Sequence, residues 1–247
     1  MRFKLRPILS EMKQLYLKPI SNTRFKGYLT KLQGDTKGDL ALPISGFNPM
    51  AKDHIITKIS ELENLGAEDL INETRQTANA HFDKPHSDEV LVVLNIADDL
   101  KGKWTNYYTT DFDSKFKLNA LVTRNYCVPY FWTSEAYSVE LIKSRTMEYL
   151  SRTAYRLNNK QPKTLQEYLS QEVFVATQID EKRKQLGPSE RENLEAYYEE
   201  HKYSDDYQVI FNFFYGDKGS DSLGYKKLGI GRLNGYDYAK SLNRTTI

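Results

Sequence analysis

The sequence has a single cysteine, Cys127, in 247 residues. An intramolecular disulfide, a cysteine-based zinc site and a redox-active CxxC pair are therefore excluded. No apolar run approaches the roughly 20 residues that a membrane-spanning helix needs, and the basic start at residues 1–6 lacks the apolar core of a secretory signal. These absences indicate a cytoplasmic protein without a disulfide or a transmembrane segment.

Recognisable nucleotide-binding loops are also missing. No Walker A sequence occurs, and Gly229–Gly235 has the spacing GxGxxxG instead of the GxGxxG that opens the first helix of a dinucleotide fold. This pattern is typical of a glycine-rich hairpin or tail, although Lys226, Lys227 and Arg232 could touch an anion. The histidines form no helical pair of ligands, so we expect no metal site, and the sequence indicates no particular cofactor.

The net charge is only +2, but it is unevenly distributed. Residues 1–37 carry nine Lys or Arg against two acids, whereas residues 190–206 carry seven acids against two basic residues. Such an asymmetry can mark an arm that binds nucleic acid or a membrane. The charges are sparse, which favours two solvated faces or a basic start that packs near an acidic helix.

Hydrophobic periodicity divides the chain into helical and strand-like parts. Apolar residues at helical spacing predict helices over 7–17 and 53–65 and from residue 67 onward. The apolar, β-branched run Val90–Ile96 is typical of a strand buried on both faces, and we expect it to be central. Further strands are predicted near 104–110, 118–123, 126–132 and 207–215; Pro129 makes the 126–132 strand an edge or bulged strand.

The remaining helices follow from capping signals. Ser134 can cap a long helix over 135–157, and capping boxes at Thr164–Glu167 and Ser189–Glu192 each open another. The strands cluster between residues 90 and 132, so we predict one α+β domain with a mostly antiparallel sheet flanked by helices. This domain covers residues 1–247, with a helical part at 1–82, a sheet-rich middle at 88–133 and a helical part with one strand at 134–247.

Two acids and one guanidinium are the candidate catalytic groups. If 104–110 is a strand, Asp111 and Asp113 follow it on the same side, and Arg124 comes level with them if the neighbouring strand pairs. Two close carboxylates can divide acid and base roles, and a guanidinium can orient a substrate anion. We therefore predict Asp111, Asp113 and Arg124 as catalytic residues. Turn hydrogen bonds and a structural ion pair explain the same residues without a function.

Aromatic side chains surround these groups in the sequence. Small-ligand pockets combine aromatic walls with a few polar points. We predict that a ligand is bound by Trp104, Tyr108, Tyr130, Trp132 and Ser134. The alternative is that the aromatic residues form the edge of the core and that Ser134 is an ordinary helix cap. Cys127 lies in an apolar strand, which favours a buried, inert thiol.

The function that best fits these residues is small-ligand binding through an aromatic and acidic pocket in 104–134, with a hydrolase or a transferase as the candidate enzyme classes. The alternative is a nucleic-acid or protein interaction module that uses the basic segment 1–37, although the total charge is too small to favour it. A structural subunit of a larger assembly would fit the 18 tyrosines.

Overall fold

The computed structural model describes residues 2–34, 39–82, 89–100, 104–179 and 186–242. Its contacts group into two compact units, Met1–Thr153 and Ala154–Ile247, and each is described by itself. The single domain expected from the sequence stays a prediction. The protein is 60% helical, with eleven helices and a few short strands among the described residues.

The first unit is built around short parallel strands. One sheet has the order β1-β2-β4 and the other pairs β3 with β5, all in parallel. The amide of Val93 donates to the carbonyl of Cys127 and that of Asn95 to Pro129, both at 2.9 Å, so the pairing continues between the two sheets. The strands are β1 (Arg2–Leu5), β2 (Glu89–Val92), β3 (Asn95–Ala97), β4 (Tyr126–Cys127) and β5 (Tyr130–Trp132).

The sequence run at 90–96 forms the middle of this arrangement, as predicted. Residues 92–97 are completely buried, and β2 lies between β1 and β4. Pro129 lies between the end of β4 and the start of β5, on the outer side of the paired strands. Its missing N–H therefore removes no hydrogen bond between strands. On the other side, Asn79 closes the edge of β1, because its side chain accepts from the amide of Phe3 at 2.8 Å and donates to the carbonyl of Phe3 at 3.0 Å.

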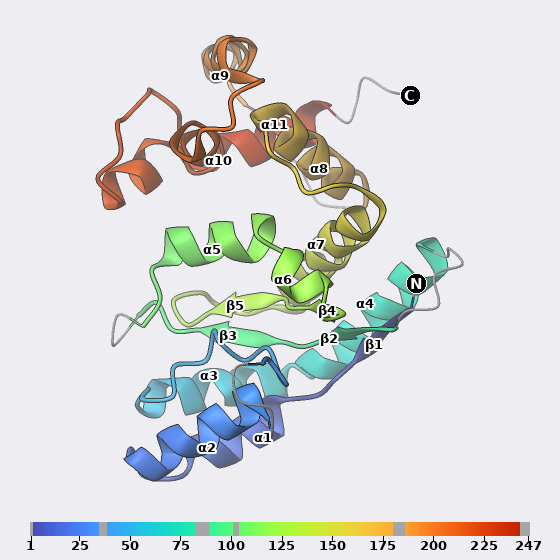
Figure 1. The fold of residues 1–247 in the computed structure, drawn as a ribbon, viewed down its shortest axis with the longest axis vertical. Coiled ribbons are helices and arrows are strands. Elements are labelled where there is room, and N and C mark those ends of the chain that lie inside the picture. The colour runs from blue at the N-terminus through green and yellow to red at the C-terminus, as the bar shows by residue number, and fades with distance from the viewer. Residues whose placement is uncertain (1, 35–38, 83–88, 101–103, 180–185, 243–247) are drawn as a thin grey trace. The chain divides into compact units, whose positions relative to one another are not determined.

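Helices cover both faces of these strands. Helices α1, α2 and α3 lie on one face, and α5 and α6 lie on the other (Figure 1). The apolar stripes expected at 7–17 and 53–65 are buried in α1 and α3. The helices of this unit are α1 (Leu9–Tyr16), α2 (Asn22–Gln33), α3 (Asp53–Asn64), α4 (Ala67–His81), α5 (Tyr107–Phe116), α6 (Asn119–Val122) and most of α7 (Val139–Asn158).

The prediction of a mostly antiparallel sheet is wrong, and three of the predicted strands form helices or lead into them. Residues 104–110 lead into α5, 118–123 contain α6 and 207–215 begin α10 (Tyr207–Ser222). Asn106 starts α5, because its side chain accepts from the amide of Thr109 at 3.1 Å. With α1 to α4 between β1 and β2, and α5 and α6 between β3 and β4, each connection is long enough to return the chain parallel to the preceding strand.

The second unit consists of α8 (Leu165–Thr177), α9 (Pro188–His201), α10 and α11 (Asn234–Leu242), with the last turn of α7. Its core is aromatic and includes Phe211, Phe213, Phe214 and Tyr215, each fully buried. Because α10 is buried on nearly all sides, its apolar residues show no helical stripe, which explains why this segment resembles a strand in the sequence.

The predicted helix caps can be compared with the first residues of the helices in the second half of the chain. The capping box of Thr164 and Glu167 is present at α8. The box expected at Ser189 lies two residues earlier, since Glu190 accepts from the amide of Gly187 at 3.0 Å and α9 begins at Pro188. Helix α7 begins at Val139, where Ser138 accepts from the amide of Leu141 at 3.1 Å, so Ser134 is not its cap.

Candidate functional site

Four polar residues face one another where β3 and β5 end. Ala97 pairs with Trp132 as the last residue of each strand, so Asp98 and Asp99 follow one strand beside Thr133 and Ser134 of the other. Ligands of parallel α/β proteins bind outside the carboxyl ends of the strands. We name this group, together with Asn48 and His54, the strand-end site.

Asp98 is the buried centre of the strand-end site, with no exposed surface. Its Oδ2 accepts from Asn48 Nδ2 at 3.0 Å, and its Oδ1 lies 2.9 Å from His54 Nε2 and 3.2 Å from Thr133 Oγ1. An ionised carboxylate only accepts hydrogen bonds, so this contact places the proton of a neutral His54 ring on Nε2. Three separate segments of the chain therefore meet at one carboxylate.

The other ring nitrogen of His54 is left without a partner. His54 Nδ1 is buried, and no hydrogen-bond partner occurs for it in the described part of the chain. A buried polar atom of this kind costs about 1–3 kcal/mol unless a water or a ligand satisfies it. The nitrogen therefore marks a position in the strand-end site that suits a hydrogen-bond donor.

Asp99 is half-buried and bound to the end of the neighbouring strand. Its Oδ1 accepts from the amide of Ser134 and from Thr133 Oγ1, both at 3.0 Å, and its Oδ2 accepts from Ser134 Oγ at 2.6 Å. Thr133 Oγ1 in turn accepts from the amides of Asp99 and Leu100. Thr133 has one hydroxyl proton, so it can donate to only one of the two neighbouring acids at a time.

A loop that precedes α3 is held against the same strands. The side chain of Asn95 in β3 donates from Nδ2 to the carbonyl oxygen of Pro43, and its Oδ1 accepts from the amide of Gly46 at 3.1 Å. A Cβ atom at Gly46 would lie 2.9 Å from the ring of Tyr130, so the loop approaches β5 as closely as a glycine allows. The hydroxyl of Ser45, the residue before Gly46, lies 3.4 Å from the hydroxyl of Tyr130.

The aromatic residues predicted to bind a ligand are divided between core and surface. Trp132 and Tyr130 are 2% and 9% exposed, and Trp132 packs on Tyr107 with 4.6 Å between ring centroids. Tyr108 is half-buried and meets Tyr107 edge-on. Trp104 is 44% exposed, and its indole nitrogen donates to the carbonyl of Ser45 at 3.5 Å. Thus Trp104 and the exposed Ser134 are the predicted residues that solvent reaches most readily.

The two acids predicted as catalytic residues lie on α5, not at the end of a strand. Residues two apart on a helix point in different directions, so Asp111 and Asp113 do not share a side. Asp111 is buried and pairs with Lys115 at 2.8 Å, and the exposed Asp113 pairs with Lys117 at 2.8 Å. Each carboxylate therefore stabilises its own turn of the helix.

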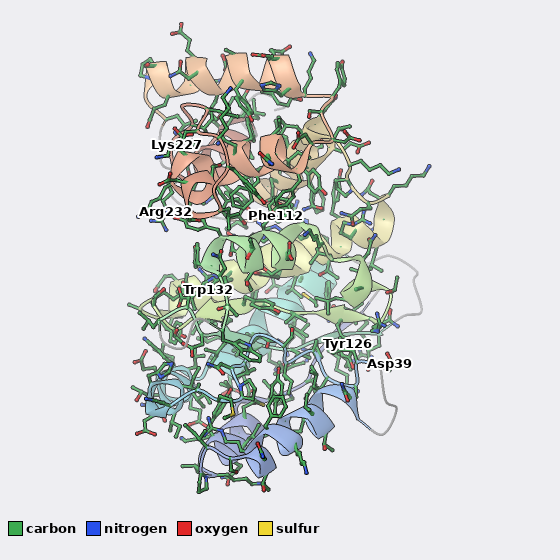
Figure 2. The ribbon with its side chains drawn as sticks, turned by 60° about the vertical axis from the view of Figure 1, so that its left-hand side comes forward. Asp39, Phe112, Tyr126, Trp132, Lys227 and Arg232 are labelled. Carbon is green, nitrogen blue, oxygen red and sulfur yellow. The ribbon has the colours of Figure 1, made fainter. Side chains whose placement is uncertain are left out.

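Arg124, the third predicted catalytic residue, belongs to the opposite end of the strands. It binds Asp39 at 3.3 Å and the carbonyl of Ala120 at 2.9 Å, just before β4 begins. Figure 2 places Asp39 and Tyr126 at one end of the sheet and Trp132 at the other. Extended residues rise about 3.3 Å each, so Arg124 lies on the order of 20 Å from the ends of β3 and β5. The structure does not bring the three predicted groups together.

Four cations of the basic segment at 1–37 pair with nearby acids. Glu11 binds both Arg6 and Lys31, at 2.5 and 2.7 Å, Lys13 pairs with Glu63, and Lys4 pairs with Glu89 at 3.3 Å. Arg24 is 3% exposed. Residues 1 and 35–37 lie outside the described residues. The use of this segment to bind nucleic acid or a protein stays a prediction.

The glycine-rich stretch of the second unit is a structural loop in its described contacts. Asp217 accepts from the amides of Leu228 and Gly229, and Lys227 pairs with Asp221 at 2.9 Å. Figure 2 shows Lys227 and Arg232 on the same side of this unit.

The sequence did contain a signal for part of the strand-end site. Asp98–Asp99 and Thr133–Ser134 each follow directly on a buried strand, which is where parallel strands present polar residues. In an antiparallel sheet the carboxyl ends of neighbouring strands lie at opposite edges, so the predicted sheet would keep the two pairs apart. Asn48 and His54 join the site only through the long-range fold, and no local pattern announces them.

Among the described residues, no group of three His, Cys, Asp or Glu side chains is arranged to hold a metal ion. In the same ranges, no helix is both long and apolar enough to cross a bilayer. Comparison of the chain with known protein families, with curated proteins and with solved structures gave no match.

Proposed function

We propose that the protein binds a small hydroxyl-bearing ligand, of the sugar or nucleoside type, at the strand-end site, and that it is a hydrolase or transferase for that ligand. The observation that carries this proposal is the pair Asp98–Asp99 beside Thr133–Ser134 at the carboxyl ends of β3 and β5. Parallel α/β proteins use this position for ligands more than any other.

Asp99 and Trp104 supply complementary parts of such a site. Asp99 Oδ2 accepts one hydrogen bond, from Ser134 Oγ, and a carboxylate oxygen can accept a second from a ligand hydroxyl. Thr105 donates to the carbonyl of Asp98 at 2.8 Å, which keeps the exposed Trp104 beside the strand end. An exposed indole face suits the flat side of a sugar or a base.

His54 is the proton acceptor in the proposed reaction. Asp98 fixes the imidazole ring through Nε2, as an acid does for a general-base histidine. The unpartnered Nδ1 takes the proton of a water or hydroxyl as its oxygen attacks the transferred group of the ligand. The bond from that group to the leaving oxygen breaks, and the imidazolium returns the proton to the leaving oxygen.

A thermal-shift screen with monosaccharides and nucleosides tests the binding step, because a ligand that prefers the native state raises its Tm. The first compound that raises Tm is then titrated by calorimetry against Asp99→Asn and against the matched control Asp113→Asn. We expect Asp99→Asn to weaken binding by about tenfold or more, through the loss of a charge-assisted hydrogen bond, and Asp113→Asn to bind normally. A panel without any shift, or equal binding by both variants, contradicts the proposal.

A further inference from the structure

A pocket of about 520 Å³ lies between the end of α1, the link to α2 and the start of α3. Its volume falls in the range of small-molecule sites. It is distinct from the strand-end site, and none of the six residues of that site lines it. The lining residues are Tyr16, Leu17, Lys18, Pro19, Ile20, Arg24, Lys52, Asp53 and Ile56.

The charges of this pocket are predominantly positive. Three cations, Lys18, Arg24 and Lys52, line it against one acid, Asp53. None of the three cations forms an ion pair within 4 Å among the described residues, and Asp53 is close enough to act electrostatically on Arg24. An anion in the pocket would therefore find two uncompensated positive charges.

Arg24 keeps one of these charges fixed below the surface. The side chain donates to the carbonyls of Pro49 at 2.8 Å, Lys18 at 3.2 Å and Tyr16 at 3.4 Å, and also to that of Ala51. Its guanidinium also lies 4.9 Å from the ring centroid of Tyr16. Carbonyl dipoles satisfy its donors but leave its net charge in place.

The start of α3 adds a further preference for negative charge. Lys52 is the N-cap residue of this 12-residue helix, and no side chain caps the first turn. The open amides and the helix dipole favour an anion at this end. Asp53 supplies one negative charge in the first turn, but it is exposed and leaves the excess of cations.

Apolar surface surrounds the same pocket. Leu17 and Ile20 are 59% and 46% exposed, and Met50, which lies between two of the carbonyls bound by Arg24, is 43% exposed. Exposed large apolar side chains that gather at one place mark a binding surface. Leu17, Pro19, Ile20 and Ile56 line the pocket and give it an apolar wall beside its cations.

We propose that this pocket binds a small amphipathic carboxylate, in which an apolar chain or ring ends in one carboxylate. The carboxylate lies between Lys18, Lys52 and the start of α3, and the apolar part lies against Leu17, Ile20 and Ile56. The pairing of apolar wall and net positive charge is the complement of that ligand. This inference is independent of the proposed function, since it rests on different residues.

The binding test uses octanoate, octylammonium and acetate with the whole chain, followed by calorimetry below the concentration at which octanoate forms micelles. We expect octanoate to bind, octylammonium to bind at least about tenfold more weakly because its charge is reversed, and acetate to bind weakly because it lacks the apolar part. Equal binding of octanoate and octylammonium, or no binding of octanoate, overturns the proposal.

Variants locate the octanoate on the protein. Lys18 and Lys52 are exposed, so a double variant with Lys18→Gln and Lys52→Gln should fold normally. We expect it to bind octanoate about fivefold or more weakly than the wild type. Lys26→Gln removes an exposed lysine of α2 that does not line the pocket and should change nothing. Equal effects of the two changes place the octanoate elsewhere and overturn the proposal.

Vesicles separate a free carboxylate from a membrane lipid as the source of the anion. The protein is sedimented with vesicles of phosphatidylcholine that contain anionic phosphatidylglycerol. We expect octanoate to bind and the vesicles to leave the protein in solution. Sedimentation with anionic vesicles that depends on Lys18 and Lys52, without octanoate binding, replaces the proposal with a membrane-docking surface.

Discussion

His54 Nε2 lies 2.9 Å from Asp98 Oδ1, and this contact joins the first turn of α3 to the carboxyl end of β3. The residues are 44 positions apart in the sequence. Asn48 approaches the same carboxylate from the loop before α3, and Thr133 approaches it from the end of β5. A single buried acid thus holds together the elements from which the strand-end site is built.

Replacing Asp98 should destabilise the protein strongly. Asp98→Ala leaves the donors of Asn48 and His54 unpaired in a buried place, whereas Thr133 can still donate to Asp99. Each unpaired donor costs about 1–3 kcal/mol when nothing replaces its partner. Because some donors will find water, we expect the free energy of unfolding to fall by about 2–4 kcal/mol in urea titrations.

The matched control for this change is Asp113→Ala. Asp113 is exposed and pairs with Lys117, an i,i+4 pair at the helix surface. Such a pair contributes about 0.3–0.5 kcal/mol. A loss of stability at Asp98 no larger than at Asp113 would contradict the central role of Asp98 in the fold.

Elements with a strong local signal could be predicted from the sequence. The stripes of α1 and α3 have one buried face, and the run at 90–96 is apolar on both sides, so each pattern indicates its structure directly. The capping box at Thr164 is equally local. These predictions required no knowledge of the partners against which the elements pack.

The failures have the opposite cause. Tyr207–Tyr215 is buried on nearly every side of α10, so the hydrophobic pattern carries no period, and its aromatic residues favour a strand by propensity alone. The direction of strand pairing depends on what the intervening chain forms. Because the sequence pattern predicts a strand where α5 forms, it shows no helical crossover between β3 and β5 and therefore does not indicate a site at their carboxyl ends.

Glu11 should give stability that depends on pH. The hydrogen bond from Lys31, opposed by partial burial and supported by Arg6, lowers the pKa of Glu11 below its ordinary value. A lowered folded-state pKa means that this stabilisation is present above the unfolded pKa of about 4.3 and is lost as the pH falls through the folded value.

The measurement compares wild type with Glu11→Gln by thermal unfolding. Both ion pairs of Glu11 are about one-third exposed, so we expect a difference below about 1 kcal/mol near pH 7 that shrinks as the pH falls toward 3. High salt should reduce the difference near pH 7 as well. A gap that grows on acidification would show that the two pairs do not stabilise the fold.

Cys127 should be chemically inert in the folded protein. Burial raises the pKa of its thiol to about 12, so almost no thiolate exists near pH 8. We expect iodoacetamide to leave native protein unmodified over the time in which it alkylates the same protein in guanidinium chloride. The mass spectrum after each treatment gives the extent of reaction. Rapid alkylation without denaturant would place Cys127 at an accessible position.

Gly216 and Gly224 form a matched pair for testing the loop contact in the second unit. Both have a positive φ, 68° and 72°, at which alanine costs about 1–2 kcal/mol of backbone strain, and Gly216 also has a ψ of −173°, in a region that is essentially restricted to glycine. A Cβ at Gly216 would also lie 2.3 Å from the carbonyl oxygen of Gly231, whereas nothing lies within 4 Å of one at Gly224. Gly216→Ala should therefore lose about 1–3 kcal/mol more than Gly224→Ala in urea unfolding followed by circular dichroism. Gly224→Ala is the control for the strain of a positive φ, and equal losses would mean that the close contact of α10 with Ile230–Gly231 does not exist in solution.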